Sequence, residues 1–280
     1  MRHVPRLDDA SGGQFHGGVT RHREIDGAVM VCTTPSETAA VEKPMHYHAR
    51  PYFWMLIDGD CKERIKGVGE RMYTPMVLTY HPSGELHSHY SGERRPSGFG
   101  IVLKDDLLAR TTEAAPITEQ PAVLLGYEFT ALADRIWEEF RLNDGPSTLA
   151  LEGLTIELLA LASRSTVARR GSPPPRWLVH AMELLHARYA ENMKFTEIAD
   201  GVGIHPVHLA AEFRRHFGCT MGDSMRTIRI AAAKRALRKS NRSIAEIAGD
   251  CGFYDEPHLC RTFKARTGMT PTQYRIRAEP

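Results

Sequence analysis

The sequence contains few cysteines, and no two of them have the spacing of a metal-binding or redox-active cysteine pair. Five cysteines are spread over 280 residues without a CxxC motif. Because their number is odd, they cannot all pair in disulfides within one chain. These features argue against a disulfide framework and favour a reducing compartment. We therefore expect a cytoplasmic protein.

Long apolar segments are also missing. No run of residues approaches the roughly 18 apolar positions that a membrane-spanning helix requires. The segment from Met1 to Gln14 is polar and lacks the apolar centre of a secretory signal peptide. We therefore expect no signal peptide, no transmembrane helix and no membrane partner.

The net charge is only +2, but it is divided unevenly along the chain. Residues 1–170 carry 19 Lys and Arg against 23 Asp and Glu, whereas residues 171–280 carry 17 against 11. The excess of positive charge in the second part indicates a polyanionic partner there. The first part is then expected to have a different role.

Short segments rich in β-branched and aromatic residues fill the region from about Phe15 to Leu103. Pro, Gly and Asp separate these segments, as at Asp58-Gly59-Asp60. This spacing predicts a small antiparallel barrel or sandwich. The expected strands are Ala28–Thr33, Tyr52–Ile57, Cys61–Ile65, Met76–Tyr80 and Gly100–Leu103.

The periodicity then becomes helical. Apolar residues recur at helical spacing in Tyr127–Leu142 and again in Ser147–Ser163, and the turn sequence Asn143–Pro146 separates them. A basic, proline-rich stretch follows at 169–175, and its three consecutive prolines exclude a helix interior. We place a domain boundary there and expect residues 176–277 to be helical throughout.

A near-duplication within residues 197–268 is the strongest fold signal in the chain. The tripeptide Glu-Ile-Ala at 197–199 recurs at 246–248, and Gly203 recurs as Gly252, both at an offset of 49. The repeated unit is a short helix, a tight turn and a second helix. This is the arrangement by which many proteins insert the second helix into a DNA major groove. After one inserted residue the offset is 50 for His208-Leu209 and His258-Leu259, Phe213 and Phe263, and Gly218 and Gly268.

Capping residues predict where these helices begin. Thr196 is expected to cap a helix from Glu197 to Gly201, and Ser243 a helix from Ile244 to Cys251. Between the two units, Gly222–Lys239 is expected to form one helix about 27 Å long. That length is comparable to the roughly 34 Å between successive major-groove faces.

The outward faces of the second helix of each unit are the candidate DNA-binding surfaces. We expect Arg261 to be the main reader of bases and Arg214 and Arg215 to bind phosphates, since Ala210 and Ala211 cannot hydrogen-bond a base edge. The candidate DNA-binding residues are His205, Val207, His208, Ala210, Ala211, Arg214 and Arg215 in the first unit, and Glu256, Pro257, His258, Cys260, Arg261 and Lys264 in the second.

Residues from about 177 to 277 resemble the DNA-binding domain of AraC/XylS-type transcriptional regulators. The resemblance is carried by the stretch from Ser243 to Lys264, by Gly268-Met269-Thr270-Pro271 and by Tyr274-Arg275. It implies two helix-turn-helix units joined by a long helix, binding of double-stranded promoter DNA and contact with RNA polymerase. We expect an activator, but the sequence alone does not distinguish activation from repression.

The first part of the chain resembles a cupin barrel, a sensor domain often attached to such readers. His46-Tyr47-His48 matches the first cupin motif, and Pro82 to His87 matches the PxGxxH motif. The resemblance implies that His46, His48 and His87 hold a divalent metal such as zinc, iron or nickel. Tyr52 stands where the motif expects a glutamate, so one ligand is missing.

Other roles for these histidines remain open. They can line an effector pocket without metal, hydrogen-bond to the backbone or face water. For an effector pocket the candidate residues are Tyr47, Tyr52, Trp54 and His87.

Together these features predict an α+β, multi-domain regulator that acts as a homodimer. The expected parts are a cupin-like sensor barrel (1–112), helices for linkage and dimerisation (113–168), a hinge (169–175) and the double helix-turn-helix domain (176–280). The alternatives are a metal-dependent cupin enzyme fused to a helical module and a DNA-binding protein that responds to no ligand.

Overall fold

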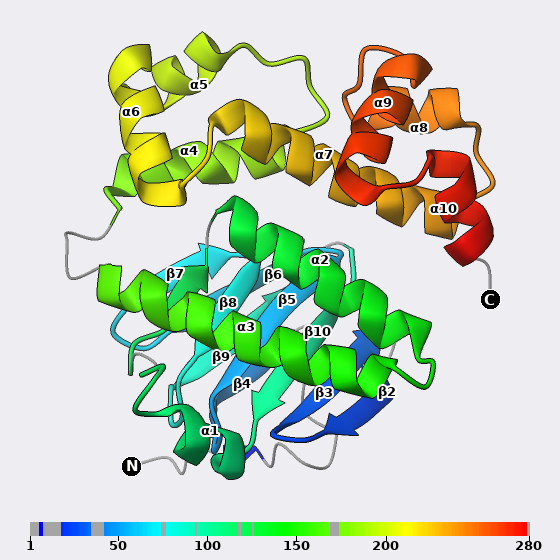
Figure 1. Cartoon of the computed structure of the whole chain (residues 1–280). Helices are drawn as coiled ribbons and strands as arrows, with labels where there is room; N and C mark the ends of the chain where they lie inside the picture. The colour runs from blue at the N-terminus through cyan, green and yellow to red at the C-terminus, as the bar shows by residue number, and fades with distance from the viewer. Residues whose placement is uncertain are drawn as a thin grey trace. The chain divides into compact units, whose positions relative to one another are not determined.

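The computed structural model describes residues 6–7, 18–34, 42–73, 77–92, 94–116, 119–124, 126–168 and 174–278. The chain divides into an N-terminal unit, residues 1–173, and a C-terminal unit, residues 174–280 (Figure 1). Residues 169–173 of the expected hinge and Met76 of an expected strand lie outside the described residues. No helix within the described part of the chain is long and apolar enough to cross a membrane.

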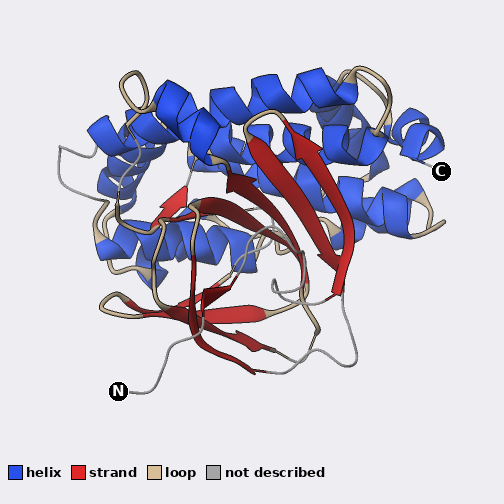
Figure 2. Ribbon diagram, turned by 90° about the horizontal axis from the view of Figure 1, so that it is seen from below, coloured by secondary structure: helices blue, strands red, loops and turns tan. Residues whose placement is uncertain are grey.

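Two β-sheets build the N-terminal unit (Figure 2). The first has the strand order β1-β4-β9-β6-β7 and the second the order β11-β8-β5-β10-β3-β2. The strands of the first sheet are β1 (Arg6–Leu7), β4 (Glu42–His48), β9 (His87–Ser91), β6 (Cys61–Ile65) and β7 (Gly69–Met72). Those of the second are β11 (Ala122–Leu124), β8 (Leu78–His81), β5 (Tyr52–Asp58), β10 (Ser97–Leu103), β3 (Ala28–Thr34) and β2 (Gly18–Ile25).

The expectation of a closed antiparallel barrel is wrong. Among the described residues no strand pairs with both sheets, and β1 pairs with β4 in parallel. The sheets instead pack face to face, since Tyr52 and Trp54 of β5 share one core cluster with Cys61 of β6. Residue alternation along a strand predicts which face is buried, but it does not determine whether the outermost strands pair with each other.

Both faces of strand β5 are buried. Tyr52, Trp54 and Leu56 lie in the core between the sheets, whereas Phe53 points the other way and is also buried. The outer face of this sheet is covered by α2 (Tyr127–Leu142) and α3 (Ser147–Ala168), which cross it in Figure 1. A short helix α1 (Asp105–Thr111) follows β10. Helix α2 has the expected bounds, and α3 extends beyond the expected Ser163.

Aromatic rings join the helical layer to the sheet. Phe99 of β10 lies with its ring centroid 5.4 Å from that of Trp137 and 4.9 Å from that of Phe140, both on α2. All three side chains are buried. Burial of one apolar face against the helices and the other against the second sheet explains why β5 and β10 are nearly continuous in apolar residues.

Seven helices form the C-terminal unit, with no strand among its described residues. Helices α5 and α6 form the first helix-turn-helix pair, α8 and α9 form the second, and α7 lies between the pairs (Figure 1). The helices are α4 (Arg176–Ala187), α5 (Phe195–Gly201), α6 (Pro206–Phe217), α7 (Met221–Lys239), α8 (Ile244–Asp250), α9 (Glu256–Thr267) and α10 (Pro271–Ala278).

One of the two expected helix caps is correct. The Ser243 hydroxyl accepts a hydrogen bond from the Glu246 amide, and the Glu246 carboxylate accepts one from the Ser243 amide, a reciprocal capping box. In the first unit the Thr196 cap is wrong, because α5 begins at Phe195. There the Glu197 carboxylate accepts a hydrogen bond from the Lys194 amide at 3.3 Å, so no hydroxyl is needed at that end.

Glycines turn the chain at equivalent places in both units, but their surroundings differ. Gly203 and Gly252 have φ of 67° and 76°, in the left-handed region that glycine tolerates best. A Cβ atom on Gly203 would meet nothing within 4 Å. On Gly252 it would lie 2.6 Å from the Tyr189 carbonyl oxygen and 2.9 Å from that of Ala190.

This difference predicts unequal costs for the same substitution. Gly203→Ala should lower the free energy of unfolding by about 1 kcal/mol, the strain of an alanine in the left-handed region. Gly252→Ala should cost clearly more, because backbone oxygens cannot move aside as a flexible side chain can. Urea denaturation followed by the helical circular dichroism signal measures both. Equal losses would contradict the close packing at the second turn.

Candidate functional site

Helix α6 presents one face to the core and the opposite face to solvent. Leu209, Phe213 and Phe217 are buried, and Pro206 begins the helix, where a missing amide hydrogen costs little. The His205 imidazole caps it by accepting a hydrogen bond from the Val207 amide at 3.4 Å. All seven candidates of this unit are exposed: His205, Val207, His208, Ala210, Ala211, Arg214 and Arg215.

Helix α9 repeats this arrangement. Asp255 caps it by accepting a hydrogen bond from the His258 amide at 2.6 Å, and Leu259 and Phe263 are buried. Four of the six candidates are exposed, whereas His258 and Cys260 are half-buried. The His258 ring packs edge-on against Phe253, which gives it a structural contact within the turn. The exposed candidates are Glu256, Pro257, Arg261 and Lys264.

The structure adds one exposed aromatic residue that the sequence reasoning missed. Tyr254 is 91% exposed and immediately precedes the cap of α9. Val207, at the start of α6, is 72% exposed and provides an apolar contact at the same end of its helix. Helical periodicity could not identify Tyr254, because it lies in the turn outside the helix.

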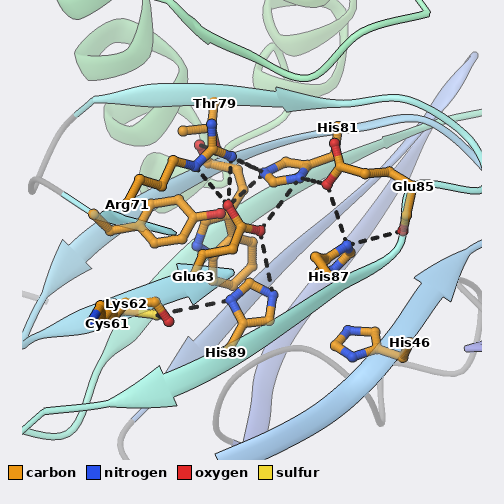
Figure 3. Close-up of polar contacts among 12 residues, drawn as sticks. His46, Cys61, Lys62, Glu63, Arg71, Thr79, His81, Glu85, His87 and His89 are labelled. Atoms are coloured by element: carbon orange, nitrogen blue, oxygen red, sulfur yellow. Dashed lines mark hydrogen bonds and ion pairs between the residues drawn. The ribbon is translucent and has the colours of Figure 1, made fainter. Parts of the chain in front are cut away.

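A second candidate site lies in the N-terminal unit, where polar side chains gather between the sheets (Figure 3). We call it the histidine cluster. Its members come from β4, β6, β8, β9 and the loop before β9, and all are buried except Glu85, which is half-buried. The members are His46, His48, Glu63, His81, Glu85, His87 and His89.

A buried ion pair anchors one side of the cluster. Glu63, fully buried, lies with a carboxylate oxygen 2.6 Å from the guanidinium of Arg71. Burial disfavours the charge on Arg71, but Tyr73 and Glu63 more than compensate and raise its pKa. Within the described residues, the other Glu63 oxygen, Oε1, makes no hydrogen bond, and it lies 3.6 Å from His81 Nδ1 and 3.8 Å from His89 Nε2.

His81 is held from both of its ring nitrogens. Its Nδ1 lies 2.8 Å from Glu85 Oε1, so Nδ1 donates and the carboxylate accepts. Its Nε2 lies 3.1 Å from the Tyr73 hydroxyl and 3.0 Å from the Thr79 hydroxyl. Burial lowers the pKa of His81 and favours the neutral ring. Burial alone would raise the pKa of Glu85, but hydrogen bonds from His81 and His87 lower it to about 2.

The three predicted ligand histidines lie close together, and the His46 and His48 ring centroids are 5.3 Å apart. His46 and His87 are cross-strand partners on β4 and β9, with ring centroids 4.4 Å apart. His48 stacks on His87 at 5.4 Å with an interplanar angle of 12°, so the two rings present faces rather than nitrogens to each other. The Tyr52 hydroxyl lies 3.2 Å from His87 Nε2.

The predicted effector-pocket residues do not all lie in one place. Tyr52 and His87 lie in the cluster, and Trp54 packs beside Tyr52 in the core between the sheets. Tyr47 lies between His46 and His48 on β4, so strand alternation places it on the opposite face of the sheet.

Several members of the cluster were not assigned by sequence reasoning. Glu63 stands between Lys62 and Arg64, in a segment that looks solvent-exposed, yet its strand alternates buried and exposed positions with Glu63 inward. The alternation of charged with apolar residues in Cys61–Ile65 was a usable signal, because Glu63 shares the face of Cys61 and Ile65. His81 and Glu85 carried no comparable signal, and neither did Arg71 beside the cluster. His89 follows His87 by two residues, a spacing that places both on one face of a strand.

The histidine cluster could hold a metal ion. Within the described part of the chain, two groups of residues have ligand atoms within 4.8 Å of one another. Both groups include His87. The first consists of His46, His87 and His89, and the second of Glu63, His81, Glu85 and His87.

The ion pair predicts a large difference between two arginines. Arg71→Leu should destabilise the N-terminal unit by about 3–5 kcal/mol, because it leaves the Glu63 carboxylate buried without a cation. Arg64→Leu removes an exposed partner of Glu70 and should leave the melting temperature nearly unchanged. Thermal denaturation of both full-length variants tests this. A melting temperature unchanged in Arg71→Leu would show that the pair contributes little.

Comparison with known proteins identifies the type of domain in the C-terminal unit. Residues 198–277 match a family model described as a helix-turn-helix domain. The chain is 31% identical over 130 residues to the uncharacterized HTH-type transcriptional regulator YpdC of Escherichia coli, covering 45% of this chain and 46% of the relative. It is 27% identical over 132 residues to the transcriptional activator RhaS of Salmonella arizonae, covering 47% and 48%. The chain thus spans about half the length of the curated relatives it matches.

Among solved structures, ToxT from Vibrio cholerae with bound unsaturated fatty acid covers 91% of this chain and 97% of its own. The identity is 11% and the TM-score 0.40, so this likeness indicates neither a ligand nor a function for this chain. The match over residues 198–277 coincides with the duplicated helix pairs described above. The C-terminal unit is thus similar to the helix-turn-helix domains of known transcriptional regulators.

Proposed function

We propose that this protein is a sequence-specific DNA-binding regulator of transcription whose N-terminal unit senses a small ligand. The observation that carries the proposal is the pair of helices α6 and α9, each with an apolar face in the core and a polar or basic face in solvent. Both relatives compared above are named transcriptional regulators rather than enzymes.

The length of α7 supports binding of both helices to one duplex. Its 19 residues correspond to about 28 Å at 1.5 Å per residue. Successive major-groove faces are roughly 34 Å apart, so α6 and α9 can reach neighbouring grooves on one side. The match of residues 198–277 to a helix-turn-helix family spans both pairs and the connecting helix.

The two helices are proposed to contribute differently. Arg261 on α9 is long enough to bind guanine with two hydrogen bonds, and Lys264 can bind a phosphate. On α6, Arg214 and Arg215 are proposed to bind phosphates. Arg215 is paired in the structure with Glu212 at 3.3 Å, a contact that DNA would replace. The small or apolar side chains can touch thymine methyl groups, namely Val207, Ala210, Ala211 and Pro257.

The N-terminal unit is proposed to control this binding. A ligand changes DNA binding only if it has different affinities for two arrangements of the protein. The buried histidine cluster supplies the polar groups for such a ligand, and a divalent metal is the cofactor it suits. The name of RhaS as an activator supports activation, with RNA polymerase as the partner.

We further propose that the protein forms a homodimer through α3. Leu149 and Ile156 on this helix are 74% and 49% exposed and stand seven residues apart. Gly153 lies between them on the same face, and a Cβ atom added there would meet nothing within 4 Å. An apolar stripe at this spacing, with a small residue that admits close approach, suits packing against the same helix of a second chain.

Two arginine variants test the proposed DNA contacts. Arg261→Ala should lose about 1–3 kcal/mol of discrimination at one base position. Arg215→Ala should weaken binding to all sequences evenly and lower the slope of log K against log salt by about one. Arg188→Ala, on an exposed arginine outside both faces, is the control. Binding measured on matched and scrambled sites would contradict the proposal if the two effects were exchanged or if no variant altered binding.

Ile156→Glu tests the dimer. The charge should dissociate the full-length protein into monomers at micromolar concentration, because a buried, unpaired carboxylate is costly. The control is Val68→Glu, at a position that is 64% exposed in a turn of the first sheet and should leave the dimer intact. Sedimentation velocity gives the oligomeric state. A wild-type protein that sediments as a monomer at this concentration would reject the proposed interface.

A further inference from the structure

We infer that the histidine cluster binds a transition-metal ion through His46, His87 and His89. This set exchanges His48, which the sequence motif implied, for His89, which it did not. The inference rests on the proposed sensing role of the N-terminal unit and names the chemical class of its ligand. It is carried by the strand register, by the hydrogen bonds of the rings and by a buried carboxylate beside them.

Strand register places the three imidazoles together. His46 on β4 is the direct partner of His87 on β9, and a register shift in β4 lies between Lys43 and His46. His89 follows His87 by two residues, so both side chains point to the same face of the sheet. All three are buried, at 3%, 0% and 6% exposure. Figure 3 shows His89 with its ring nitrogens near Cys61 and Glu63, and His87 with a ring nitrogen near Glu85.

Hydrogen bonds hold two of the rings in the tautomer that a metal needs. His46 Nδ1 lies 2.7 Å from the Pro44 carbonyl oxygen, and His87 Nδ1 lies 3.1 Å from that of Glu85. A carbonyl oxygen only accepts, so each Nδ1 carries the proton and each Nε2 keeps its lone pair. This is the arrangement by which proteins orient metal-binding histidines.

A carboxylate completes the surroundings of His89. Glu63 is its cross-strand partner on β6, and Glu63 Oε1 lies 3.8 Å from His89 Nε2. That oxygen is fully buried and makes no hydrogen bond within the described part of the chain. A buried carboxylate oxygen without a donor is costly, and a cation placed beside His89 would remove this cost.

The other candidate groups are less suited to a metal. His48 stacks on His87 and lies edge-on to His46, but it belongs to neither group of residues whose ligand atoms lie within 4.8 Å of one another. In the group that contains Glu63, His81 and Glu85, existing contacts compete with a metal, although Glu63 Oε1 and Glu85 Oε2 make no hydrogen bond within the described residues. Arg71 neutralises Glu63, and Glu85 accepts the proton of His81 Nδ1. A metal there would have to displace these contacts, whereas at the three histidines it displaces the Tyr52 hydroxyl from His87 Nε2.

The chemistry of the donors selects the metal. Neutral imidazoles suit zinc, iron, nickel and copper, whereas calcium and magnesium prefer oxygen ligands. The three ligand atoms lie within 4.8 Å of one another and must approach to roughly 3.4 Å for a tetrahedral zinc site with bonds of about 2.1 Å. Small rotations of the rings provide this movement. A fourth position then remains open for water or a small anionic ligand.

Zinc binding to the full chain tests the inference. After treatment with a chelator, the wild type should bind one zinc ion per chain, and zinc should raise its melting temperature. His46→Gln and His89→Gln should each lower zinc affinity by at least about 100-fold. His48→Gln is the matched control, since it removes the motif histidine, and its affinity should stay within about threefold of the wild type.

Three outcomes would overturn the inference. These are a wild type that binds no stoichiometric zinc at micromolar concentration, loss of zinc in His48→Gln with retention in His89→Gln, and loss only when His81 or Glu85 is replaced. X-ray absorption of the zinc-loaded wild type needs no variant, so it decides the case even if a variant fails to fold. Three imidazole ligands are expected, and two imidazoles with two carboxylates would assign the other group.

The same preparations separate this inference from the proposed function. DNA binding is measured with and without zinc. Stoichiometric zinc with unchanged DNA affinity would refute sensing through the metal and leave the metal site intact. Absence of DNA binding in both states would refute the proposed function without bearing on the ligands of zinc.

Discussion

The buried pair of Glu63 and Arg71 is the constraint on which the N-terminal unit depends. Two charges removed from water must be held at close range, and here the guanidinium lies 2.6 Å from the carboxylate. The pair fixes β6 against β7, where these residues are direct partners. It also leaves one carboxylate oxygen turned toward the histidines. The polar interior between the sheets is therefore built around a satisfied ion pair with one oxygen directed at the imidazoles.

The C-terminal fold could be predicted closely from the sequence because its signals are local. Caps, turns and helical periodicity are properties of a few neighbouring residues, and Ser243 and Gly252 behave as these rules require. The wrong prediction at Thr196 also concerns only neighbouring residues, because the carboxylate of Glu197 accepts the hydrogen bond that a hydroxyl was expected to accept. The duplication by itself predicts the order of the helices along the chain.

The N-terminal unit was predicted less well because its signals are long-range. Strands such as Tyr52–Asp58 were located from composition, but β4 and β9 were not, since polar and histidine-rich strands do not resemble strands of a core. Which sheet edges pair, and so whether a barrel closes, depends on contacts between distant segments. The spacing of two residues places His89 on the same face as His87, but its register with Glu63 depends on contacts between distant segments.

The turn between α8 and α9, which contains Gly252, is more closely packed than its counterpart between α5 and α6. Gly252 lies against the carbonyls that follow α4, and Arg229 of α7 donates hydrogen bonds to the carbonyl oxygens of Tyr189 and Glu191 in the same connection. These contacts attach the turn before α9 to the segment that joins α4 to α5. Its partner Gly203 has open space around it. The turn between α8 and α9 should therefore accept fewer kinds of side chain than the turn between α5 and α6.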